Sequence, residues 1–115
     1  MSQEDLRRGL SRAEVETLRK EAWIGDAVLC LWARLHILND AGVVDGPKCI
    51  RITSNQFLAA FGDPTVVEAE LGRVYKTEGE AAAFRWIEER LAPTFSRQEE
   101  NRRKRLGIGR VKNKA

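Results

Sequence analysis

Several residue types are scarce in this chain, and their scarcity excludes whole classes of protein. Cysteine occurs twice and histidine once among 115 residues, which gives no zinc-binding pattern and no serine–histidine or cysteine–histidine catalytic signature. The most apolar segment, residues 21–38, is too short for a membrane span and carries charged side chains, including Asp26 and Arg34. A run of charged residues precedes it, so we expect no signal peptide. The two cysteines are expected to be reduced thiols of a cytoplasmic protein.

The composition that remains is that of a folded domain with an uneven charge distribution. Hydrophobic residues make up 43% and charged residues 32% of the chain, as in globular proteins. Residues 97–115 contain eight basic and two acidic residues, a net charge of +6, whereas the other 96 residues sum to −3. We therefore expect one domain over residues 1–95 and a flexible basic tail over residues 96–115. Such a tail either binds a polyanion, usually nucleic acid, or simply aids solubility.

Hydrophobic periodicity and capping signals predict an all-α fold. Ser11 and Glu14 have the spacing of a capping box, so a helix is expected to begin there and to break or bend near Arg19. A second helix is expected over residues 21–39, where apolar residues follow the helical period. Residues 43–51 contain aspartate, glycine and proline and are expected to form a loop.

The second half of the chain is also predicted to be helical. Residues 53–55 can cap a short helix that carries Phe57, Leu58 and Phe61. Pro64 follows a capping aspartate and is expected to begin a helix that runs to about residue 77. Gly79 separates it from a further helix, which Pro93 is expected to end.

Two acidic residues, Asp26 and Glu68, lie within strongly apolar helical segments. An ionised carboxylate is costly to bury unless it is paired or bound to a cation. Asp26 could instead be stabilised in a first helical turn or pair with an arginine, and Glu68 could face solvent. Each acid has a glycine nearby, however, and two helices that meet at Gly25 and Gly72 would bring the carboxylates face to face. Two convergent carboxylates are suitable ligands for Mg²⁺.

Four segments resemble the ribonuclease III domain family in the correct order. The first, "WIGDAVLCLW" over residues 23–32, is similar to the family signature read roughly as E-x-x-E-F-L-G-D-A-V-L. "TVVEAELGRVY" resembles the second acidic helix, D-x-F-E-A-L-I-G-x-x-Y. "ITSNQFLAAFG" is similar to the V-S-N-x-x-L-A stretch between them, and "EGEAAAFRWIEERL" resembles the closing helix. Together the matches cover about residues 15 to 92.

The chain also departs from the family pattern. Family members place four acids at the site, but Arg19 and Thr65 occupy two of those positions here. The remaining pair, Asp26 and Glu68, is similar to the short Mini-III branch. The family's connection between the S-N stretch and the second acidic helix is missing between Phe61 and Pro64. The resemblance thus implies a ribonuclease III-like helical domain that is shortened in the middle.

The resemblance implies a fold, a reaction and partners. Family members are homodimers that cleave duplex RNA, and Trp23 takes the place of an aromatic dimer contact, although ordinary core filling is an equal alternative. Asp26 and Glu68 would be the catalytic residues and hold Mg²⁺, which activates water and stabilises charge on the phosphate. Because the tail has no aromatic residues, it would recognise RNA by charge and shape. Its candidate RNA-binding residues are Arg102, Arg103, Lys104, Arg105 and Arg110.

Three functional hypotheses therefore remain. The first is a Mg²⁺-dependent endoribonuclease that processes double-stranded or structured RNA. The second is a catalytically weak scaffold that binds RNA or a ribonucleoprotein, which Arg19, Thr65 and the shortened centre favour. The third is a helical interaction domain with an accidental resemblance to the family.

Overall fold

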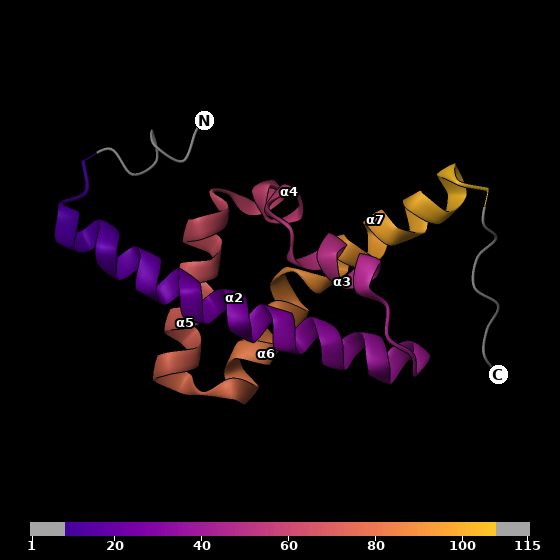
Figure 1. The fold of residues 1–115 in the computed structure, drawn as a ribbon, viewed down its shortest axis with the longest axis horizontal. Coiled ribbons are helices and arrows are strands. Elements are labelled where there is room, and N and C mark those ends of the chain that lie inside the picture. The colour runs from indigo at the N-terminus through magenta and orange to yellow at the C-terminus, as the bar shows by residue number, and fades with distance from the viewer. Residues whose placement is uncertain (1–8, 108–115) are drawn as a thin grey trace.

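The protein is all-α throughout residues 9–107, the part of the chain that the computed structural model describes. Figure 1 shows one long helix, α2, that crosses α5 and α6, while α7 extends away from the crossing. No β-strand occurs within the described residues. The elements in chain order are α2 (Arg12–Ala41), α3 (Gly46–Thr53), α4 (Asn55–Leu58), the 3₁₀ helix η1 (Ala59–Phe61), α5 (Pro64–Glu78), α6 (Glu80–Arg90) and α7 (Ala92–Arg105).

Helix α2 is continuous over 30 residues. The Ser11 capping box is present, as expected, and Gly42 ends the helix in the left-handed conformation at φ 74°. The break expected near Arg19 does not occur. Residues 19–22 are Arg, Lys, Glu and Ala, which all favour the helix, so nothing there interrupts it.

Within residues 9–107, no helix combines the length and the apolar character needed to cross a bilayer.

The loop predicted over residues 43–51 is largely wrong, because α3 begins at Gly46. The Asp45 side chain accepts a hydrogen bond from the Lys48 amide at 3.0 Å, and Pro47 lies in the first turn. Aspartate, glycine and proline in this order therefore start a helix here, although the same residues are equally typical of a turn.

The remaining boundaries of the central helices follow the sequence. The Ser54 hydroxyl caps α4 by accepting from the Phe57 amide at 3.1 Å. Asp63 caps α5 and Pro64 is its first residue, as predicted. Gly79 separates α5 from α6 with φ 93°, a conformation that favours glycine.

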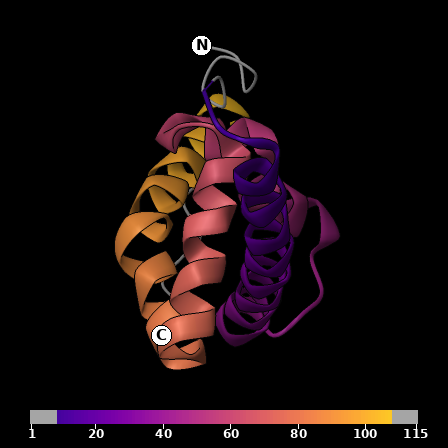
Figure 2. The same cartoon turned by 90° about the vertical axis from the view of Figure 1, so that its left-hand side faces the viewer.

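The core forms where α5 packs between α2 and α6 (Figure 2). Its apolar side chains come from all six α-helices, so a single core joins the described residues. The buried members are Val28, Leu29, Trp32, Ala33, Ile52, Phe57, Leu58, Leu71, Ala83, Ile87, Leu91 and Phe95.

Helix α7 spans the domain boundary expected at residue 95 and continues into the segment expected to be a flexible tail. Helix α7 begins at Ala92, with Pro93 in its first turn, and continues to Arg105. Pro93 thus starts a helix as well as following one. Phe95 and Glu99 are buried on its inner face, so α7 is packed against the domain at its beginning and middle. The part of the predicted tail over residues 108–115 lies outside the described residues.

Candidate metal-binding site at the crossing of α2 and α5

The acid pair is positioned by a close contact between two glycines. A Cβ atom placed on Gly25 would overlap the carbonyl oxygen of Glu68 and lie 3.0 Å from the amide nitrogen of Gly72. A Cβ on Gly72 would in turn overlap the carbonyl oxygen of Glu21. The two backbones therefore touch, and the predicted meeting of α2 and α5 at these glycines is confirmed.

This contact brings the side chains of Asp26 and Glu68 together. Asp26 follows Gly25 directly, and the Glu68 backbone is the group that Gly25 contacts. Hydrogen bonding and charge repulsion between the two carboxyl groups are strong enough to affect the ionisation of Glu68. The suggestion that Glu68 simply faces solvent is thus wrong.

Burial is the main reason that the pKa of Glu68 rises from 4.5 to about 8. The hydrogen bond with Asp26 and the negative charge of Asp26 raise it further. At neutral pH and without a cation, Glu68 is therefore largely protonated and shares its proton with Asp26. Two carboxyl groups that hold one proton in this way are a candidate cation site.

The pair lies in a surface depression of about 550 Å³. Asp26 is exposed and Glu68 is half-buried at its wall. Arg19 and Thr65, which the sequence resemblance aligns with two acids of the ribonuclease III pattern, line the same depression. The two residues at which the chain departs from that pattern therefore lie beside the acid pair.

Three further polar residues of the depression were not among the predicted site residues. Glu16 and Lys20 lie on the face of α2 that carries Trp23 and Asp26, and the helical spacing of 4, 3 and 3 residues could have identified them. Asn55 reaches the depression from the start of α4. It stands in the S-N stretch of the resemblance, but only the fold shows that this stretch lies beside the acids.

Within the part of the chain that the structure describes, no ion pair neutralises the acid pair. Among residues 9–107, neither Asp26 nor Glu68 forms an ion pair. An ion pair across the crossing joins Arg73 to Glu21 at 2.9 Å. The Arg73 guanidinium is therefore paired with Glu21 and not with the acid pair. The pairing of Asp26 with a core arginine, which the sequence left open, does not occur.

The donor set fits a hard cation that needs few protein ligands. No cluster of three or more histidine, cysteine, aspartate or glutamate side chains suited to a metal occurs in the described part of the chain. Mg²⁺ is commonly held by one or two carboxylates, with water and substrate phosphate completing its shell. Two carboxyl groups at an open depression meet that requirement, whereas a closed all-protein site would need more ligands.

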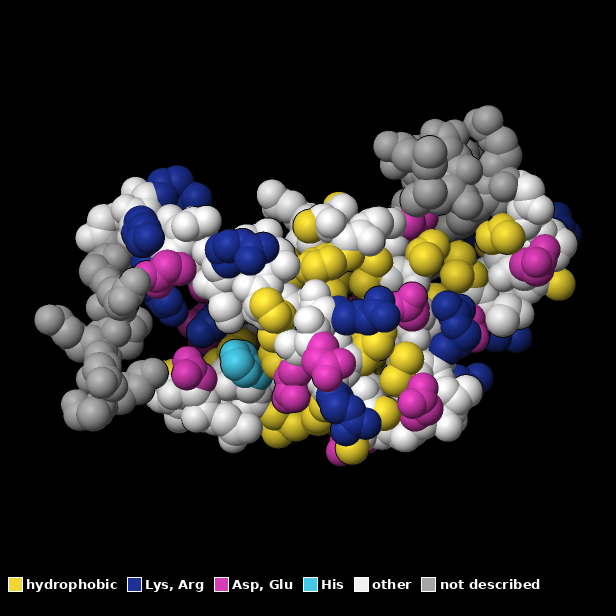
Figure 3. All heavy atoms as spheres, turned by 180° about the vertical axis from the view of Figure 1, so that it is seen from behind, with side chains coloured by type: hydrophobic (Ala, Val, Ile, Leu, Met, Phe, Trp, Pro, Cys, Tyr) yellow, Lys and Arg dark blue, Asp and Glu magenta, His cyan; other side chains and the backbone are white. Residues whose placement is uncertain are grey.

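The predicted RNA-binding residues lie at a different place from the acids. Arg102, Arg103, Lys104 and Arg105 occupy the last turn of α7, and Arg110 lies outside the described residues. Basic side chains gather at the end of the molecule that α7 forms, as the view from behind shows (Figure 3). The structure therefore places this basic end away from the crossing of α2 and α5 (Figure 1).

Trp23 does not fill the core. Its side chain is 78% exposed, which rules out that alternative within this fold. Leu31, Leu35 and Leu38 are also exposed on α2, and with Trp23 and Ala27 they form a stripe at helical spacing, which we call the α2 apolar stripe.

No protein-family model, curated protein or solved structure matches this chain.

Proposed function

We propose that the protein is a Mg²⁺-dependent endoribonuclease of the ribonuclease III type, acting on double-stranded or structured RNA in RNA processing. The observation that carries this proposal is the convergence of Asp26 and Glu68 in an open depression, where neither acid forms an ion pair with any residue between 9 and 107. The ordered sequence resemblance identifies the same two residues and supports the same reaction.

The residues at the crossing have distinct roles in this proposal. Bound Mg²⁺ would supply an activated water and stabilise negative charge on the phosphate. Asp26 and Glu68 would hold the ion, and Glu68 must first release its proton. Arg19 and Lys20 line the depression and would bind the phosphate oxygens of the scissile strand.

We further propose that two copies of the chain associate through the α2 apolar stripe. An exposed tryptophan followed by three exposed leucines on one helix is costly to leave in water. The family resemblance places a dimer contact at Trp23, at the end of this stripe.

The free thiols of Cys30 and Cys49 suit the proposed cytoplasmic location.

Replacing the acids without changing their shape tests the proposal. Duplex RNA is incubated with Mg²⁺ and the wild-type protein, Asp26→Asn or Glu68→Gln. We expect each substitution to reduce the cleavage rate by more than about a hundredfold, because a charged ligand is lost. Asp40→Asn on α2 and Glu70→Gln on α5 are the matched controls and should cleave like the wild type. Cleavage that survives both acid substitutions would contradict the proposal.

The scaffold hypothesis remains the second candidate because Arg19 and Thr65 stand in the depression where the family has acids. An RNA-binding scaffold would bind the duplex without cleaving it, and neither acid substitution would alter its affinity. Absence of RNA binding by the wild type would instead favour a helical interaction domain.

A further inference from the structure

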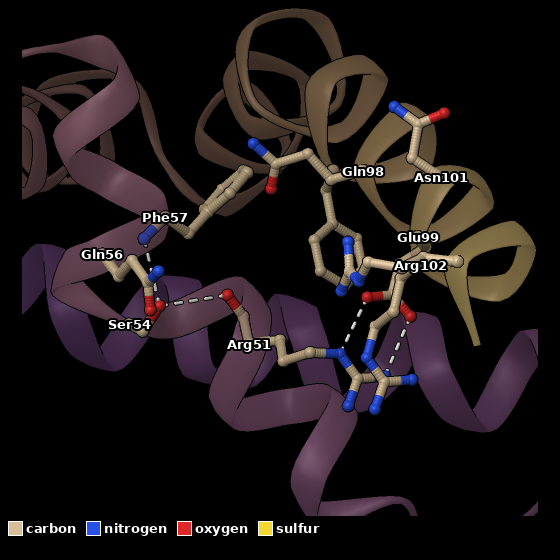
Figure 4. Close-up of a pocket in the computed structure, with 10 residues that line it drawn as sticks. Arg51, Ser54, Gln56, Phe57, Gln98, Glu99, Asn101 and Arg102 are labelled. Atoms are coloured by element: carbon tan, nitrogen blue, oxygen red, sulfur yellow. Dashed lines mark hydrogen bonds and ion pairs between the residues drawn. The ribbon is translucent and has the colours of Figure 1, made fainter.

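A second cavity, of about 490 Å³, lies between α7 and the segment that joins α3 to α4. Arg51, Ser54 and Gln56 form one wall, and Gln98, Arg102 and Arg105 form the other. Figure 4 shows Ser54 and Gln56 at one end of the cavity, and Arg51 and Arg102 beside Glu99 at the other. The lining is therefore rich in hydrogen-bond donors.

The net charge of the cavity comes from Arg102 and Arg105. Arg51 donates two hydrogen bonds to Glu99, at 2.8 and 2.9 Å, so these two charges neutralise each other. Arg102 lies close enough to Glu99 to help lower the pKa of that carboxyl group. Neither Arg102 nor Arg105 forms an ion pair within residues 9–107. The cavity thus has two positive charges in excess.

The cavity and the acid depression are both lined by residues at the start of α4. Ser54 and Gln56 line the cavity, whereas Asn55, between them in the chain, lines the depression with Asp26 and Glu68. Consecutive Cα atoms are about 3.8 Å apart, so the two hollows share a short stretch of backbone at Asn55. An RNA strand bound in the depression would have to pass Asn55 to reach the cavity.

We propose that this cavity is a phosphate-binding subsite for the RNA strand that the acid pair cleaves. The inference rests on the proposed function and adds the path of the substrate. Arg102 and Arg105 would bind phosphate oxygens in the forked geometry that guanidinium groups favour. The amides of Gln56 and Gln98 can donate to phosphate and either donate to or accept from the ribose hydroxyl.

Two pairs of basic residues in the same helical turn allow a matched test. Arg102→Ala with Arg105→Ala removes two charges from the cavity. Arg103→Ala with Lys104→Ala removes two charges from the same turn. The sequence predicted that these two residues also bind RNA, but neither lines the cavity, so the subsite assigns them no phosphate contact. Both variants change the helix propensity and the charge at the end of α7 in nearly the same way. Circular dichroism verifies folding, and the corresponding glutamine pairs repeat the test if an alanine pair unfolds.

Binding of a fluorescent RNA duplex is measured in EDTA, so that cleavage cannot interfere, over a series of salt concentrations. We expect the Arg102/Arg105 pair to weaken binding at least about tenfold and to reduce the slope of log K against log salt by about 2 units. The Arg103/Lys104 pair should weaken binding less than about threefold.

The outcomes separate the subsite from the nuclease. Equal weakening by the two pairs, or no binding by the wild type, overturns the subsite. A selective effect of Arg102 and Arg105 supports the subsite even if Asp26→Asn and Glu68→Gln show that the acids do not catalyse cleavage. Cleavage that depends on the acids, together with equal weakening by both pairs, rejects the subsite and leaves the nuclease intact.

Discussion

At the scale of single residues, the surroundings of Glu68 determine its charge. Its side chain is half-buried on α5 and faces Asp26 on α2. Both features favour the neutral acid, and together they raise its pKa to about 8. The protonation of one carboxyl group therefore depends on a contact between two helices.

This raised pKa predicts how stability changes with pH in the absence of divalent cations. The unfolded chain releases the Glu68 proton near pH 4.5, whereas the folded protein keeps it up to about pH 8. The folded state binds more protons between these values, so the free energy of unfolding should fall as the pH rises through this window. Urea titrations at pH 5 and pH 8 measure the change. Glu68→Gln should remove this part of the pH dependence, whereas a dependence retained by Glu68→Gln but lost in Glu70→Gln would contradict the assignment.

The same proton should be displaced when Mg²⁺ binds. The cation requires the ionised form of Glu68, so binding at pH 7 should release up to one proton per site, and affinity should rise with pH up to about 8. Calorimetry in two buffers with different ionisation enthalpies measures the proton release. If Mg²⁺ binds without releasing a proton, Glu68 is not a ligand.

The acid pair could be predicted from the sequence because its neighbours are informative. Apolar residues surround Asp26 and Glu68, and a helix rarely contains glycines such as Gly25 and Gly72 without a close packing partner. The positions of Lys20 and Asn55 could not be predicted in the same way. Lys20 looks like any exposed helical lysine, and Asn55 reaches the site only because α4 folds against it.

At the scale of secondary structure, the glycine crossing and the link between α3 and α7 hold the elements in place. The crossing brings α2 and α5 into backbone contact, and the paired Arg51 and Glu99 tie α3 to α7. Each can be tested by a substitution with a clear physical expectation.

Gly72→Ala should destabilise the protein. Alanine improves helix propensity by about 1 kcal/mol, but its Cβ would overlap the Glu21 carbonyl, and overpacking typically costs about 1–3 kcal/mol. The backbones must then separate, so RNA cleavage should also fall. Gly46→Ala is the control, because a Cβ there meets open space and should leave the melting temperature unchanged or higher. Equal melting temperatures for the two variants would show that the crossing is not tight.

Arg51→Ala should cost about 2 kcal/mol of unfolding free energy at pH 7, because hydrogen bonds to the buried carboxylate of Glu99 are lost. Arg51 holds the pKa of Glu99 below its ordinary value. The stabilisation is therefore present above about pH 4.5 and is lost as the pH falls through the lowered pKa. Denaturant titrations at pH 7 and pH 3.5 should show the difference from the wild type shrinking in acid. Arg85→Ala, an exposed arginine on α6, should have little effect at either pH.

Element boundaries were predictable where a single capping residue decides them, as at Ser11, Gly42 and Pro64. The loop prediction was wrong at residues 45–47 because aspartate, glycine and proline suit both a turn and a helix start. Only packing of Ile52 into the core selects the helix. Helix α7 was not predicted for a related reason. Its run of charged residues is typical of a solvated segment, whereas its ordering depends on the burial of Phe95 and on the pairing of Glu99 with the distant Arg51.

At the scale of the whole molecule, the described chain is elongated and leaves one side of α2 uncovered. Its dimensions are 52 × 31 × 21 Å and its radius of gyration is 15.7 Å, whereas a compact domain of this length would have about 13 Å. An elongated shape buries less apolar surface within one chain. The exposed stripe from Trp23 to Leu38 is therefore consistent with burial against a second copy.

Leu31→Glu combined with Leu35→Glu should convert a dimer to a monomer. Two charges placed in the middle of the α2 apolar stripe would be costly to bury in an interface, and both residues are already exposed in a single chain, so folding should be retained. Sedimentation velocity measures the change. Leu106→Glu, at an exposed position beyond α7, is the control and should leave the assembly intact. A wild type that sediments as a monomer at high concentration would reject the dimer.

The touching backbones at Gly25 and Gly72 also limit how the site can move. Neither helix can swing without displacing the other, because no side chain lies between them to deform. Local fluctuations should therefore rarely expose the amides at this point, and their hydrogen exchange should proceed mainly through global unfolding. The two carboxyl groups would then keep their spacing until the entire domain opens.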